Sequence, residues 1–157
     1  MAQPIQEKSM MSKIMALDLG DSWTGVALTD ASRMFARPHT TVPTLELQSF
    51  LQNTFSNEQI NIIIIGHPRT MKGGESEQTL KIHAQRDQLI KAFPEKEFIL
   101  WDERLSSKRA EALGSRIKSR EEKLKTHARA AAFILDSYIS FLQLQEGTEQ
   151  EKFDRIE

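Results

Sequence analysis

Residues Lys13 to Asp30 read KIMALDLGDSWTGVALTD, and this stretch decides the predicted fold. It contains two short apolar runs joined by a polar turn around Gly20, a pattern that predicts a pair of neighbouring strands. One carboxylate, Asp18, lies inside the first strand, where an uncompensated buried charge costs roughly several kcal/mol. Asp18 therefore needs a cation or hydrogen bonds to balance its charge.

Beyond this hairpin, the sequence alternates between strand and helix patterns. The run 60–66 is almost continuously β-branched, which is typical of a central parallel strand buried on both faces. The other predicted elements are a strand at 34–36 ended by Pro38, a helix from the N-cap Thr44 to Asn57, a helix at 75–93, a strand at 98–101, and helices at 108–113 and 126–144. This order predicts an α/β, ribonuclease H-like fold: a mixed five-stranded sheet, with three antiparallel strands plus two parallel strands, and helices on both faces.

Length and composition indicate one globular domain. The 157 residues are 39% apolar and 27% charged, and we expect a flexible leader at 1–12, the domain at 13–144 and a polar C-terminal tail at 145–157. No apolar run approaches the roughly 18 residues of a membrane span, and the opening segment lacks the apolar part of a secretory signal. These features predict a cytoplasmic protein. The absence of cysteine excludes disulfides and thiolate metal sites.

The net charge of −1 gives no global basic field, but basic residues cluster locally. The cluster consists of Arg116, Lys118, Arg120, Lys123 and Lys125. It is either a solvated polar loop or a patch that contacts nucleic-acid phosphates, because backbone binding depends on clustered Lys and Arg.

Acidic residues occur at two predicted strands. Asp18 lies within the first strand, and Asp102 and Glu103 follow the last one. If these strands converge, their carboxylates must hold a divalent cation or share protons, and oxygen ligands suit Mg²⁺ or Mn²⁺. Structural alternatives remain: Asp18 could cap its own turn, and Asp102 could pair with Arg104 or cap the next helix.

Four ordered motifs resemble the YqgF family, also called RuvX. They are Asp18-Leu19-Gly20 with Gly25-Val26-Ala27, Ile65-Gly66-His67-Pro68 with Met71-Lys72-Gly73, Asp102-Glu103-Arg104-Leu105-Ser106, and Ala130-Ala131-Ala132-Phe133-Ile134-Leu135. The resemblance spans residues 13–144. It implies a cytoplasmic, metal-dependent nuclease that hydrolyses phosphodiester bonds of structured nucleic acid. The substrate that the resemblance implies is pre-16S rRNA, processed at its 5′ end.

The resemblance also implies roles for individual residues. Asp18 and Glu103 match two metal-binding acids of the family, whereas strand alternation turns Asp102 away from Glu103. The third family acid is replaced by His127, which could bind the metal ion, act as a general base, or merely be an exposed residue at a helix start. Candidate nucleic-acid contacts are Arg69, Lys72, Arg104, Arg116, Lys118 and Arg120.

Other functions are compatible with the same residues. The loss of one family acid favours a nucleic-acid-binding or ribosome-assembly protein without cleavage, and branched DNA is an alternative substrate that would make the protein a Holliday junction resolvase. A phosphotransferase of the actin-like fold would need a second such domain and a longer chain. The sequence leaves open the choice between a monomer and a homodimer, the latter suiting paired cuts in a junction.

Overall fold

A computed structural model describes residues 12–67, 76–102 and 120–154 of the chain. Within them the elements are β1 (Lys13–Leu19), β2 (Trp23–Thr29), β3 (Ala36–Pro43), the 3₁₀ helix η1 (Thr44–Glu46), α2 (Leu47–Asn57), β4 (Ile60–His67), α3 (Glu77–Ala92), β5 (Glu97–Asp102) and α5 (Arg120–Asp154).

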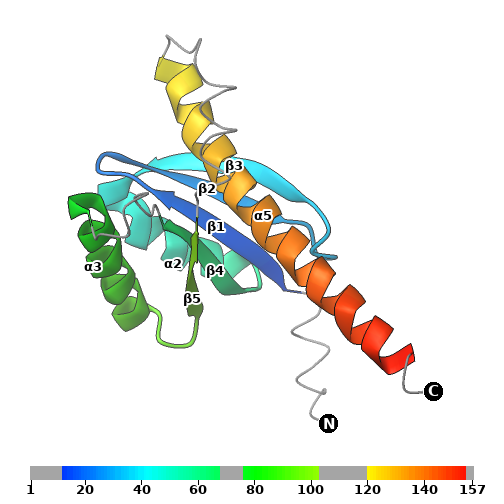
Figure 1. The fold of residues 1–157 in the computed structure, drawn as a ribbon. Helices are drawn as coiled ribbons and strands as arrows, with labels where there is room; N and C mark the ends of the chain where they lie inside the picture. Colours follow the sequence, from blue (N-terminus) through cyan, green and yellow to red (C-terminus); the bar gives the residue numbers. More distant parts are fainter. Residues whose placement is uncertain (1–11, 68–75, 103–119, 155–157) are drawn as a thin grey trace.

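The five strands form a single mixed sheet in the order β3-β2-β1-β4-β5 (Figure 1). β1 pairs antiparallel with β2, and β2 pairs antiparallel with β3. On its other edge β1 pairs parallel with β4, which pairs parallel with β5. The predicted ribonuclease H-like sheet, with its antiparallel hairpins continuing into two parallel strands, is therefore confirmed.

Helices cover both faces of the sheet and divide the core into two layers. On one face, Leu17, Val26 and the isoleucines 63 and 65 pack with apolar residues of α2 and α3. On the other face, Ile14, Ala16 and Ile64 pack with residues of α5, which crosses the sheet diagonally in Figure 1. β4 contributes to both layers, as its continuous β-branched sequence predicts.

The third strand is longer than predicted. It runs from Ala36 to Pro43 rather than over 34–36, and it continues through Pro38. β3 is an edge strand that pairs only with β2 among the described strands, so a residue without an N–H group is tolerated there. The register between β2 and β3 shifts at Val26/Ala27, beside the proline.

The helix boundaries also differ from the predictions. Thr44 begins η1 instead of capping α2, because its hydroxyl donates to the carbonyl oxygen of Gly20 at 2.7 Å. α5 starts before the predicted residue 126 and continues through 145–154, which was expected to be a polar tail. The predicted helix at 108–113 lies outside the described residues. No helix in the described part of the chain is long and apolar enough to span a membrane.

Candidate active site

Asp18 lies near the carboxyl end of β1, on the face that α5 covers. Side chains alternate between the two faces of a strand. Ile14 and Ala16, four and two residues earlier, are fully buried on the α5 side of the sheet. Asp18 continues this series, and its carboxylate therefore points toward α5 and away from α2 and α3.

Gly25 allows α5 to approach this end of the sheet. It is the register partner of Asp18 in β2, and a Cβ atom added to it would lie 1.9 Å from the carbonyl oxygen of His127 and 2.8 Å from the amide nitrogen of Ala128. The helix backbone thus packs directly on the strand backbone. Only glycine permits this separation, which fixes the start of the packed part of α5 beside Asp18.

His127 belongs to the sheet-facing stripe of α5. It precedes the buried Ala131 by four residues, and residues with this spacing lie on one helix face. At the position of His127 the sheet presents Asp18 rather than an apolar side chain. The stripe that packs α5 on the sheet therefore also directs the imidazole to the carboxylate.

The Asp18 Oδ2 and His127 Nδ1 atoms are 3.8 Å apart. The side chains are 26% and 37% exposed, respectively, so both are shielded yet reachable from solvent. Within the described residues, the Asp18 carboxylate makes this contact and does not cap the turn at 20–22. A carboxylate oxygen and an imidazole nitrogen are both donors for a divalent cation.

The three parallel strands end at the same edge of the sheet. Leu17 pairs with Ile65, and one residue farther along β4, Gly66 pairs with Trp101 of β5. The Trp101 indole packs on α5, where its Nε1–H donates to the Ser137 hydroxyl at 3.2 Å. Asp102 follows Trp101 and so lies on the opposite face from Asp18, as strand alternation predicts. Glu103 lies outside the described residues.

A groove lies between β3 and the residues of α5 around Ala128. It measures about 460 Å³ and is lined by Pro38, His39, Thr40, Thr41, Lys125, Ala128 and Arg129. Lys125 and Arg129 are exposed and lie one helical turn apart on the side of α5 that faces β3, whereas the His127 imidazole faces Asp18. The groove carries two cationic side chains, and β2 separates its β3 wall from Asp18 in β1.

The sequence pattern predicts only part of this groove. It includes Lys125 in the basic cluster and assigns no role to His39 or Arg129. The spacing of four between Lys125 and Arg129, on either side of His127, was the available signal. The predicted phosphate contacts Arg69, Lys72, Arg104, Arg116 and Lys118 lie outside the described residues, and so does the side chain of Arg120.

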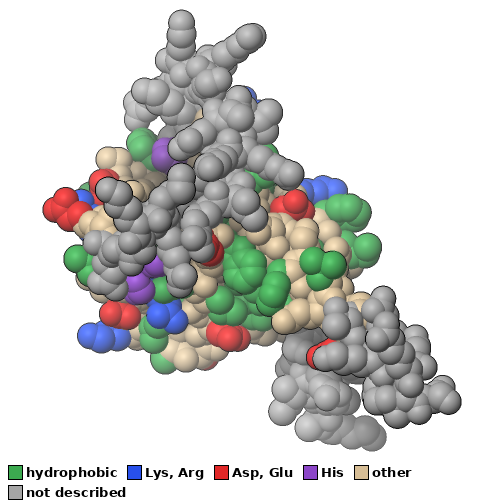
Figure 2. Space-filling model, in the orientation of Figure 1, with side chains coloured by type: hydrophobic (Ala, Val, Ile, Leu, Met, Phe, Trp, Pro, Cys, Tyr) green, Lys and Arg blue, Asp and Glu red, His purple; other side chains and the backbone are tan. Residues whose placement is uncertain are grey.

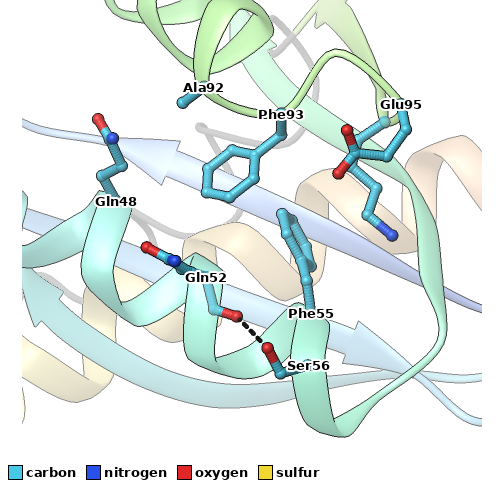
Figure 3. A pocket seen from close by; sticks show the side chains of 8 residues that line it. Gln48, Gln52, Phe55, Ser56, Ala92, Phe93 and Glu95 are labelled. Atoms are coloured by element: carbon cyan, nitrogen blue, oxygen red, sulfur yellow. Dashed lines mark hydrogen bonds between the residues drawn. The ribbon is translucent and has the colours of Figure 1, made fainter.

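A second hollow, of about 360 Å³, lies on the other side of the sheet (Figure 3). The rings of Phe55 and Phe93 meet edge to face there, with centroids 5.0 Å apart. Lys96 Nζ lies 5.0 Å from the centroid of Phe55. This hollow belongs to the layer of α2 and α3, whereas Asp18 faces α5, so the two are separate.

Comparisons with known proteins place the chain among related sequences. A solved structure, Thermus thermophilus RuvC in complex with a Holliday junction substrate, aligns with a TM-score of 0.48 and 10% identity over 78% of this chain and 93% of that one. A Rubrobacter xylanophilus protein is 35% identical over 81% of this chain and 91% of its own length. A Phocaeicola vulgatus protein is 37% identical over 82% of this chain and 96% of its own length. Both are named as candidate pre-16S rRNA nucleases. A family model described as RuvX, Holliday junction resolvase, matches residues 12–141, and the chain therefore belongs to this family of nucleases.

Proposed function

We propose that this protein is a cytoplasmic, metal-dependent nuclease that hydrolyses phosphodiester bonds at the 5′ end of pre-16S rRNA. The observation that carries the proposal is the approach of the Asp18 carboxylate to His127, 3.8 Å apart, at the carboxyl end of a parallel strand. The names of the curated relatives support the choice of RNA as substrate.

Asp18, Glu103 and His127 are the proposed ligands of a Mg²⁺ or Mn²⁺ ion. Such an ion activates water for attack on phosphorus and stabilises the charge that develops on the leaving oxygen. Asp18 supplies a shielded carboxylate, and its contact with His127 holds both donors at one point of the sheet edge. An imidazole in place of a third acid lowers the negative charge of the site by one, which favours Mn²⁺ over Mg²⁺.

The groove between β3 and α5 is the proposed path of the nucleic-acid backbone. Lys125 and Arg129 supply positive charge on α5, and Thr40 and Thr41 supply hydroxyl donors on β3. Phosphate contacts of this kind position the substrate without reading its sequence. The basic residues Arg69, Lys72, Arg104, Arg116, Lys118 and Arg120 are proposed to extend the same surface.

Cleavage of a 5′-extended 16S precursor RNA in Mn²⁺ or Mg²⁺ tests the proposal. Asp18→Asn keeps the size of the side chain but removes its charge, and we expect it to lower the rate by at least about 100-fold. Precursor that stays intact with the wild-type protein in both metals, while still being bound, would instead support the binding or assembly function. Faster cleavage of a four-way DNA junction than of the RNA would identify a junction resolvase.

His127→Asp tests the role of the histidine. This substitution restores the carboxylate that the family resemblance implies, and we expect it to raise the Mg²⁺-supported rate relative to the Mn²⁺-supported rate. His127→Ala should lower both rates by about 10- to 100-fold. Undiminished Mn²⁺-dependent cleavage by His127→Ala would remove His127 from the mechanism.

Substitution of the two groove cations tests the backbone path. Lys125→Ala and Arg129→Ala should each weaken RNA binding and reduce the slope of log K against log salt by about 0.7, the value for one lost single-strand phosphate contact. Lys91 is an exposed lysine in the last turn of α3, away from the groove, and Lys91→Ala is the matched control. Equal effects of all three substitutions would place the RNA elsewhere.

A further inference from the structure

Two histidines meet on the face of the sheet opposite Asp18. His67 is the last residue of β4, and His83 lies in α3. Their Nε2 atoms are 3.2 Å apart, and their rings are nearly perpendicular, at 74° with centroids 5.1 Å apart. Both side chains are only partly buried, and histidine side chains reach the surface over α3 in Figure 2. A dissolved ion can therefore reach the pair.

The separation of the two nitrogens fits a shared metal ion. Nitrogen ligands at about 2.0–2.1 Å from a tetrahedral Zn²⁺ lie roughly 3.3–3.4 Å from each other. In the structure the two Nε2 atoms already face each other at 3.2 Å, close to that value. We propose that His67 and His83 form a binding site for a zinc-like transition-metal cation, with Nε2 of each imidazole as a ligand.

The proposed site is independent of the candidate active site. His67 continues the alternation of the buried residues Ile63 and Ile65, which pack toward α2 and α3, whereas Asp18 faces α5. Imidazole nitrogens favour Zn²⁺, Ni²⁺ or Cu²⁺, whereas carboxylates suit Mg²⁺ and Mn²⁺. The two sites thus differ both in position and in the ions they select.

Two protein ligands leave part of the coordination sphere to water. Within the described residues there is no group of three or more His, Asp or Glu side chains that could hold a metal ion. The ion would join the end of β4 to α3, two elements that are separated along the chain by residues 68–76. Because an ion that binds only the folded state stabilises it, zinc should raise the melting temperature.

Zinc titration followed by the NMR signals of the histidine rings tests the proposal. The chain contains four histidines, His39, His67, His83 and His127, so each ring can be assigned by substitution. The titration is done in the Asp18→Asn background, which weakens the other candidate site. We expect the signals of His67 and His83 to move together and saturate at one Zn²⁺ per chain, while that of His39 does not move.

Affinity measurements by calorimetry complete the test. In the same Asp18→Asn background, His67→Ala and His83→Ala should each weaken zinc binding at least tenfold and abolish the zinc-dependent rise in melting temperature, whereas the control His39→Ala should change neither. His83→Asn serves as a second variant if His83→Ala does not fold. Absence of saturable zinc binding to the Asp18→Asn chain, or equal binding after His67 or His83 is also substituted, would show that the pair is only a hydrogen bond.

Discussion

Gly25→Ala is the substitution to which the site should be most sensitive. The added methyl group would lie 1.9 Å from the His127 carbonyl oxygen, where an ordinary contact is at least 3.4 Å. Relieving the overlap requires α5 and β2 to separate by about 1.5 Å. Both colliding groups are backbone atoms held by regular structure. β2 is paired with a strand on each side, and α5 is held by its buried stripe, so neither group can yield through a side-chain rotation.

The expected cost is that of an overpacked core, about 1–3 kcal/mol, and the upper end applies because backbone atoms collide. Urea unfolding followed by circular dichroism measures this change in the free energy of unfolding. Since His127 moves with the helix, the metal-dependent activity should also fall in the fraction that remains folded. Gly147→Ala is the control, because Gly147 is an exposed helix residue with no atom within 4 Å of the added methyl group. That control should stabilise the protein by about 0.5–1 kcal/mol.

A free energy of unfolding for Gly25→Ala within about 0.5 kcal/mol of the wild-type value, the usual range for a surface substitution, would contradict this packing. Such a result would mean that α5 does not rest on the β2 backbone. A loss of stability with full activity would separate the packing from the site, and would show that the position of His127 does not matter for catalysis.

Two further predictions concern the end of β2 and the turn that follows it. The buried Thr29 hydroxyl accepts a hydrogen bond from the backbone N–H of Ile14 at 2.9 Å, so Thr29→Val should cost about 1–3 kcal/mol in urea unfolding by leaving that N–H unpaired, whereas Thr29→Ser, which keeps the hydroxyl, should cost less. The pKa of Asp30 is lowered from its usual 3.8 by the Ser32 hydroxyl first and by the backbone N–H of Phe35 second. The carboxylate therefore contributes stability that is fully present above about pH 4 and is lost as the pH falls through the lowered pKa. Acid unfolding between pH 5 and 2 should be less steep for Asp30→Asn, and an unchanged curve would contradict this.

Local patterns in the sequence were sufficient to predict most of the fold. The β-branched run of β4 and the turn around Gly20 identify strands through periodicity and turn chemistry, which depend on near neighbours. The predicted end points of the strands and helices were less accurate, above all for the edge strand β3 and the start of α2. Pairing with β2 extends β3 beyond its predicted length. The Thr44 hydroxyl donates to the carbonyl oxygen of Gly20 instead of capping α2. In the second case the two partners are 24 residues apart, so a local pattern does not show the contact.

The candidate site was also only partly predictable from the sequence. The sequence by itself identified Asp18 as a carboxylate that needs a partner and His127 as a departure from a family motif. Only the tertiary structure brought the two within 3.8 Å, because Gly25 lets the backbone of α5 rest on β2. The groove with Lys125 and Arg129 and the meeting of His67 with His83 were likewise decided by packing. Each of these contacts joins segments far apart in the chain, and local sequence patterns carry no information about such distances.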